Sequence, residues 1–168
     1  MNADTLSKRA RTALLAATGY ARDRLHGEVA PEHLLLALVL DQQGAVPTLL
    51  TELGCEPTLV ERRLLGVLDR PRRAASGEPK TGAQLKHILT SATREAKRSG
   101  DGKVKTDHLL IAIADGPPSD AVSVLNEMGI TRPAIRTLLK RARGPAPGRP
   151  RENPSDGSGT KGAAPNTD

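Results

Sequence analysis

The stretch that decides the fold is APEHLLLAL at residues 30–38, because nearly the same pattern returns as KTDHLLIAI at residues 105–113. The two copies lie 75 positions apart, and the residues around them align without a gap. The element LTELG at 50–54, for example, recurs at the same offset as LNEMG at 125–129. A fixed period of this kind indicates one structural unit that is built twice.

Each unit predicts four helices. Apolar residues spaced three and four apart from Leu6 to Leu25 predict the first helix, with Thr5 or Ser7 as its cap. Pro31 is placed to open the second helix, and Gly54 is placed to end the third. The fourth helix follows, and the whole order then repeats. We therefore predict an all-α fold of eight helices in two four-helix repeats, which an approximate two-fold axis relates.

The chain divides into one domain and a tail. The first repeat is expected at about residues 5–70 and the second at about 81–143, so that residues 1–143 form a double-repeat domain. Between the repeats, residues 71–80 show no apolar periodicity and are predicted to be a linker. Residues 144–168 are rich in Gly and Pro and offer little to bury, which predicts a disordered tail.

Composition limits which residues can form the core and indicates where the protein is located. Aromatic residues make up 1% of the chain, so Leu, Ile, Val and Ala must form the core. The one cysteine, Cys55, excludes an internal disulfide and corresponds to Ile130 in the second copy, which favours a role as small core filler. The polar N-terminus and the short apolar runs predict a cytoplasmic protein with no membrane partner.

The net charge of +6 permits two interpretations. Basic residues are densest in what we call the arginine cluster, which consists of Arg62, Arg63, Arg70, Arg72 and Arg73. Such a cluster binds phosphates in some proteins, and a solvated helix end and linker is the simpler interpretation. No aromatic residue accompanies the arginines, so stacking on nucleic-acid bases is not supported.

The two signatures, in register and with the right helices around them, resemble the N-terminal domain of Clp/AAA+ unfoldases, best seen in ClpC- and ClpA-like chaperones. The resemblance covers roughly residues 5 to 143. It implies a non-catalytic protein-binding module, an accessory or regulator of the Clp chaperone–protease system. The implied partners are a Clp ATPase, the Clp protease core, adaptors or substrate proteins.

No enzyme activity is expected from the sequence. Nothing matches the Gly-x-x-x-x-Gly-Lys-[Ser/Thr] loop that cradles nucleotide phosphates, and the chain stops where an unfoldase would begin its ATPase module. No catalytic residue, cofactor or metal site is predicted. The alternative function is a basic, helical, nucleic-acid-associated protein, although nucleic acid is not expected as a partner of a Clp-like module.

The candidate ligand-binding residues are Glu32, Thr106 and Asp107, at the starts of the two signature helices. Unpaired N–H groups there favour an anion, and a neighbouring carboxylate suits a guanidinium. By resemblance to ClpC-like domains, these positions would bind phosphorylated arginine. Pro31 stands where that family has a threonine, and Asp107 is one methylene shorter than the usual glutamate. The simpler interpretation is that both carboxylates favour the positive end of a helix.

His33 and His108 occupy equivalent positions, each after a carboxylate. Neither has a second ligand at the spacing that zinc sites on helices use. We expect each imidazole to be partly buried and to form a hydrogen bond with the neighbouring loop, which would fix the helix start.

Overall fold

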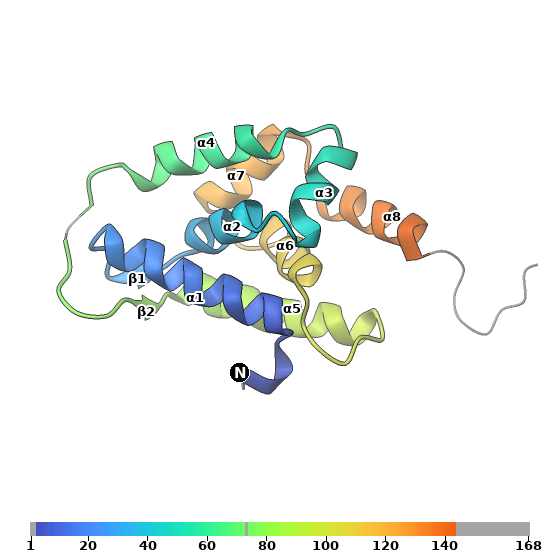
Figure 1. Cartoon of the computed structure of the whole chain (residues 1–168), viewed down its shortest axis with the longest axis horizontal. Helices are drawn as coiled ribbons and strands as arrows, with labels where there is room; N and C mark the ends of the chain where they lie inside the picture. Colours follow the sequence, from blue (N-terminus) through green and yellow to red (C-terminus); the bar gives the residue numbers. More distant parts are fainter. Residues whose placement is uncertain (1–2, 73, 144–168) are drawn as a thin grey trace, which may run out of the picture. The chain divides into compact units, whose positions relative to one another are not determined.

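The second repeat follows the first helix by helix, in the order that the sequence predicts (Figure 1). The structure is a computed structural model that describes residues 3–72 and 74–143. Its described residues contain eight α-helices, which confirms the predicted all-α fold. The helices are α1 Lys8–Asp23, α2 Pro31–Leu40, α3 Ala45–Glu52, α4 Pro57–Leu68, α5 Ala83–Arg98, α6 Thr106–Ala114, α7 Asp120–Glu127 and α8 Arg132–Arg143, and the 3-10 helix η1 Ala3–Thr5 precedes them.

Local sequence signals set most of the helix ends. Ser7 is the N-cap of α1, and its Oγ accepts a hydrogen bond from the Ala10 N–H at 3.1 Å. Pro57 is the first residue of α4, where its missing N–H leaves no bond unmade. Gly54 and Gly129 follow α3 and α7 with φ angles of 83° and 76°, a conformation that suits glycine. These signals act over a few residues, so they are readable in the sequence.

Short extended segments connect the two repeats. Strand β1 (Glu28–Val29) pairs in parallel with strand β2 (Lys80–Thr81), which leads into the second repeat. In the other direction, Leu6 forms a parallel bridge with Val104. The pairs Val29–Thr81 and Val104–Leu6 are related by the 75-residue offset. The two repeats therefore make equivalent contacts with each other. Such reciprocal contacts are what an approximate two-fold axis produces.

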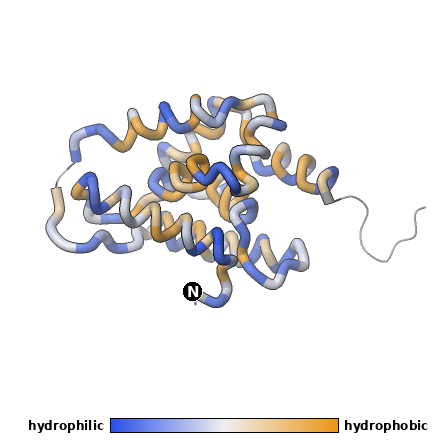
Figure 2. Tube along the Cα trace, viewed as in Figure 1, coloured by the Kyte–Doolittle hydropathy of each residue, from blue (hydrophilic) through white to orange (hydrophobic). Residues whose placement is uncertain are grey.

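Helices α2 and α6 lie in the core. Pro31–Val39 and Thr106–Ile113 are buried without a break, and Figure 2 shows hydrophobic residues concentrated along both helices. Helix α2 packs against α1, α4, α6 and α7, while α6 packs against α5, α7, α3 and α1. A helix that is apolar on all sides must be covered on all sides, and this explains why α1, α3, α4, α5 and α7 all pack against this pair.

One residue departs from the predicted helix face. Leu25 was expected on the buried side of the first helix, yet α1 ends at Asp23 and Leu25 is 58% exposed with a φ of 56°. The expectation was wrong because the apolar spacing continues past the point where the helix stops. Cys55 is buried, as predicted, and its counterpart Ile130 is buried too.

The chain divides into two units, and the boundary between residues 138 and 139 falls within α8. The tail predicted from residue 144 lies outside the described residues. Across the described ranges no single helix is long and apolar enough to cross a membrane, and only α2 and α3 together, bent by 87°, meet those criteria.

Candidate functional site

Glu32, the second residue of α2, is buried and connects the two repeats. Its Oε2 accepts a hydrogen bond of 3.2 Å from the backbone N–H of Ala121, in the first turn of α7. On the other oxygen, Arg72 Nη2 lies 4.0 Å from Oε1. Burial raises the pKa of the Glu32 carboxyl, and the nearby Asp120 raises it further, while the Ala121 N–H and Arg72 lower it. The carboxylate therefore sits at the start of α7, where the N–H groups of the first turn favour a negative charge.

Thr106 and Asp107 lie together at the start of α6, in the second repeat, and both are buried. Asp107 Oδ1 accepts a hydrogen bond of 2.7 Å from the backbone N–H of His108. The predicted site residues thus form two separate places, one per repeat, each at the start of a signature helix. At both places, a ligand would have to replace or share contacts that the carboxylate already makes.

His33 and His108 fix the starts of these helices, as predicted. His33 Nδ1 accepts a hydrogen bond from the Ala30 N–H, and His108 Nδ1 accepts one from the Lys105 N–H, both at 2.9 Å. Because a hydrogen bond arrives at Nδ1, each neutral ring carries its proton on Nε2. Each histidine therefore satisfies the N–H of the residue before its helix, which has no partner within the helix.

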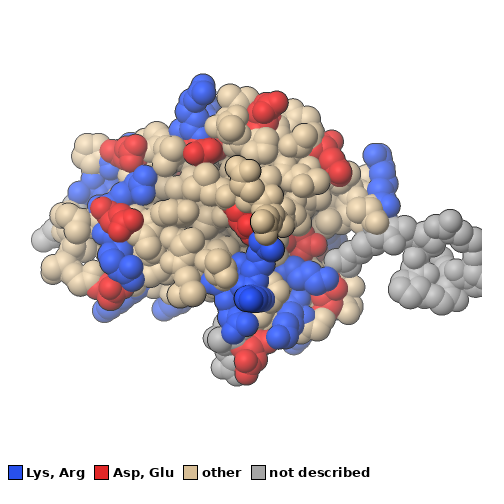
Figure 3. All heavy atoms as spheres, in the orientation of Figure 1, with Lys and Arg blue, Asp and Glu red and all other residues tan. Residues whose placement is uncertain are grey.

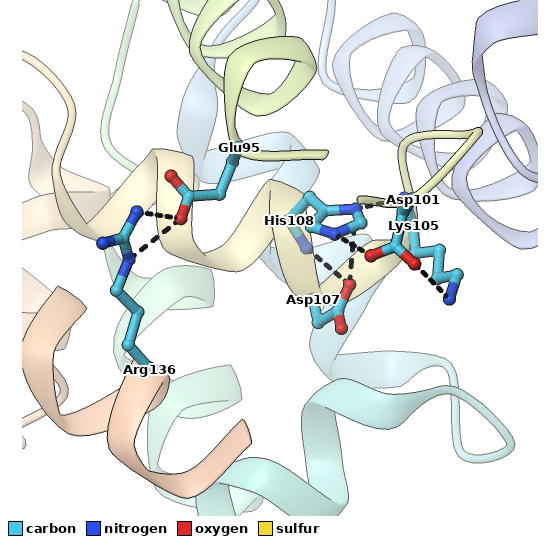
Figure 4. A network of polar contacts seen from close by, with 6 residues as sticks. All are labelled: Glu95, Asp101, Lys105, Asp107, His108 and Arg136. Atoms are coloured by element: carbon cyan, nitrogen blue, oxygen red, sulfur yellow. Dashed lines mark hydrogen bonds and ion pairs between the residues drawn. The ribbon is translucent and has the colours of Figure 1, made fainter. Parts of the chain in front are cut away.

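The partner of the Nε2 proton differs between the repeats. In the second repeat, His108 Nε2 lies 2.8 Å from Asp101 Oδ2, and Lys105 Nζ lies 3.2 Å from Asp101 Oδ1. Figure 4 shows Asp101, Lys105 and Asp107 around the His108 ring. In the first repeat, the position of Asp101 is taken by His26, so two neutral imidazoles meet. This difference was not noticed in the sequence, although aligning the two copies at the 75-residue offset would have shown it.

The two histidines of the first repeat, His26 and His33, both have lowered pKa values. Burial first, and then the nearby His26, Arg72 and Arg24, together lower the pKa of His33 to about 4. Burial also lowers the pKa of His26. Both rings are therefore neutral near pH 7.

The arginine cluster is divided by the structure. Arg62, Arg63 and Arg70 line a groove of about 480 Å³ between α4 and α7, which we call the α4–α7 groove. Arg63 forms an ion pair with Glu127, and Arg70 lies 3.6 Å from Asp120. Arg72 approaches Glu32 instead, and Arg73 lies outside the described residues. Acidic residues of α7 thus offset much of the positive charge in this groove.

Charge on the visible surface is mixed. Figure 3 shows basic side chains gathered around the start of α1, while acidic and basic side chains are scattered over the rest of this face, much of which is uncharged. Among the described residues, no group of three or more His, Cys, Asp or Glu could hold a metal ion. The residues at the starts of α2 and α6 offer carboxylates and a hydroxyl, which suit binding of a ligand by hydrogen bonds and charge.

Comparison with known proteins agrees with the fold and the repeat. The chain is similar to the chaperone protein ClpB of Mycobacterium bovis, with 32% identity over 147 residues, which is 86% of this chain. The chain spans 17% of the length of that chaperone. Among solved structures, the Hsp104 N-terminal domain from Candida albicans superposes with a TM-score of 0.71 at 23% identity, covering 83% of this chain and 91% of the domain.

A second solved structure is a complex of a ClpV N-domain with a VipB peptide. It matches with a TM-score of 0.66 at 20% identity, covering 82% of this chain and 86% of that one. The family described as the Clp repeat (R) N-terminal domain matches residues 5–128. The chain therefore belongs to the Clp repeat N-terminal domain family.

Proposed function

We propose that this member of the Clp repeat N-terminal domain family is a non-catalytic module that docks proteins for the Clp chaperone–protease system, as an accessory or regulator. The observation that carries the proposal is the family match over residues 5–128. The ClpV N-domain in complex with a VipB peptide supports it, because a domain of this fold there holds a segment of another protein. The partners would be a Clp ATPase, the protease core, adaptors or substrates.

Two experiments test the module. Purified chain should neither hydrolyse ATP nor cleave casein. The tagged chain should also recover a Clp component from native cytosol, identified by mass spectrometry, and should bind the purified component in a direct titration. An unrelated helical protein of similar net charge, on the same resin, is the control, since binding through surface charge alone weakens as salt rises. Failure to recover any Clp component would count against the module.

Within this function, we propose an arginine-phosphate group as a ligand of the helix starts. Glu32 and Asp107 would hold the guanidinium, and N–H groups of the helix start, with the Thr106 hydroxyl, would hold the phosphate. The Thr106–Asp107 site should bind better, because Pro31 lacks both the hydroxyl and the N–H. Glu32 also has the Ala121 N–H and Arg72 beside it, and a ligand would compete with both.

Calorimetry with phosphoarginine on the wild type, Asp107→Ala and Glu32→Ala tests this ligand. We expect Asp107→Ala to weaken binding more than Glu32→Ala. No binding by the wild type would reject the ligand and leave the docking module intact, because the module is tested by its association with a Clp component. Binding that neither substitution weakens would place the ligand elsewhere.

Nucleic-acid association is the alternative function. The positive charge that suggested it is partly neutralised, since Arg63 and Arg70 pair with acidic residues of α7. Protein docking therefore ranks first. A gel shift at rising salt separates the two functions, because binding driven by phosphates falls steeply with salt.

A further inference from the structure

A small arginine-lined hollow lies in the second repeat, away from the helix starts discussed above. It has a volume of about 130 Å³ and lies among α5, the end of α6 and the first residue of α8. We call it the arginine hollow. The polar and charged residues that line it are Ser91, Arg94, Glu95, Arg98, Asp115 and Arg132. Its volume is several times the roughly 30 Å³ that one water occupies in the liquid, so it has room for a small polyatomic ion.

The two carboxylates of the arginine hollow already have partners. Buried Glu95 accepts a hydrogen bond of 2.9 Å from Arg136 Nε and one of 3.4 Å from Arg132 Nη2, and Figure 4 shows Arg136 reaching it from α8. Asp115 accepts a hydrogen bond of 2.9 Å from Arg132 Nη1. Arg98 also approaches Glu95, at 3.8 Å. The negative charge is thus held by arginines and is not free to bind a cation.

Positive charge and donors remain after this pairing. Three arginines line the hollow against two carboxylates, and Arg136 also pairs with Glu95, which leaves an excess of positive charge at the hollow. Among the described residues, no hydrogen bond or ion pair joins Arg94 to a carboxylate. Arg132 Nε is buried and is the one buried side-chain nitrogen or oxygen there that has no hydrogen-bond partner. A buried donor without an acceptor is costly, and a bound anion would supply the acceptor.

The first repeat shows that the fold does not require this arrangement. At the 75-residue offset, Ser91 and Arg94 correspond to Ala16 and Gly19, and Arg98 corresponds to Asp23. Arg132, in turn, corresponds to Pro57. The first copy builds the same helices with none of these donors. The arginines and the serine therefore belong to a feature that only the second repeat carries.

We propose that the arginine hollow binds a phosphate group, with Arg94, Arg98 and Arg132 supplying charge and the Ser91 hydroxyl and Arg132 Nε donating hydrogen bonds. The donors come from two helices, Ser91, Arg94 and Arg98 from α5 and Arg132 from α8. Donors on both sides suit a tetrahedral dianion, which presents oxygens in several directions. Guanidinium groups form strong, charge-assisted hydrogen bonds with phosphate oxygens. This site is independent of the proposed docking function and of the helix-start ligand.

The test is a titration of the full chain with inorganic phosphate, followed by melting temperature and by calorimetry at constant ionic strength. A ligand that binds the folded state raises the melting temperature, and chloride at the same ionic strength should not. Arg94→Gln should weaken phosphate binding about tenfold, as expected for one lost charge-assisted contact. It should leave the fold intact, because Arg94 makes no described contact with a carboxylate.

Three further variants make the result specific. Arg62→Gln removes an arginine of the α4–α7 groove and should leave phosphate affinity unchanged. Asp115→Asn removes a negative charge and should tighten binding, an effect that a purely structural role of Asp115 would not produce. Asp107→Ala, at the helix-start site, should have no effect on inorganic phosphate.

A phosphoserine peptide and its unphosphorylated form then identify the source of the group. Tighter binding of the phosphopeptide than of inorganic phosphate would indicate a protein-borne phosphate, and equal affinity would indicate the free ion. The proposal is overturned if phosphate has no effect beyond that of chloride, or if Arg62→Gln weakens binding as much as Arg94→Gln.

Discussion

His33 Nε2 lies 2.9 Å from His26 Nδ1, so two buried imidazoles share one hydrogen bond in the first repeat. Their ring centroids are 5.1 Å apart, and the rings are inclined at 62°. In the equivalent place of the second repeat, a histidine meets the carboxylate of Asp101. If His33 were protonated, its Nδ1–H would face the Ala30 N–H, which now donates to Nδ1. The charged ring would also lie near the positive charges of Arg72 and Arg24. Acid should therefore destabilise the first repeat through this pair of histidines.

We expect the free energy of unfolding to fall as the pH drops from about 6.5 to about 4. Burial lowers the folded-state pKa of His33 to about 4, below the 6.5 of an unperturbed histidine. Between these values the unfolded chain binds more protons, so the stability present above pH 6.5 is lost as the pH falls. The loss from His33 alone is about 3 kcal/mol. Urea unfolding at a series of pH values measures it, and His87→Gln, at an exposed position of α5, should leave the profile unchanged.

Replacing His26 by aspartate gives His33 the carboxylate partner that His108 has in Asp101. In His26→Asp, a carboxylate would accept the Nε2 proton of His33 and stabilise the charged ring, so the pKa of His33 should rise. The loss of stability between pH 6.5 and 4 should then be smaller than in the wild type. NMR titration of the His33 ring measures the pKa directly. An unchanged or lower value would show that burial outweighs the partner.

Glu32→Gln should leave the protein as stable as the wild type, or more stable, at pH 7. The folded-state pKa of Glu32 is raised mainly by burial, so its stabilising contribution is present below the unfolded value of 4.5 and is lost as the pH rises. Glutamine keeps an oxygen for the Ala121 N–H without a buried charge. Glu32→Ala lacks that acceptor and should lose about 1–3 kcal/mol. Thermal unfolding of both variants at pH 7 tests this, and a Glu32→Gln that is as unstable as Glu32→Ala would show that the charge itself holds the repeats together.

Leu35→Ala and Leu110→Ala should each destabilise the protein by roughly 2–5 kcal/mol, the range for buried leucines. Both side chains are fully buried at equivalent positions of α2 and α6. Leu15→Ala is the control, because Leu15 is 74% exposed on α1 and should change stability by no more than about 0.5 kcal/mol. Wild-type stability in either core variant would mean that the leucine is not packed as described.

The sequence by itself determined the helices, their order and the duplication. Helix ends depend on residues such as Ser7, Pro57 and Gly54, which act within one turn, so their effect can be read locally. The role of His33 and His108 at the helix starts was also predictable, because the atom that each histidine contacts is three residues away. The apolar spacing continues to Leu25, although helix α1 ends at Asp23, and at Leu25 the prediction was wrong.

Only the tertiary structure decided how the copies join and what surrounds the candidate residues. The Glu32–Ala121 bond spans 89 positions, and Arg136 meets Glu95 from 41 positions away. Residues so far apart are brought together by helix packing, and no short pattern in either segment records that they meet. Whether a carboxylate at a helix start is open or buried depends on the same packing. The starts of α2 and α6 are equivalent in sequence because the unit is repeated. They differ in chemistry because tertiary packing gives their side chains different partners.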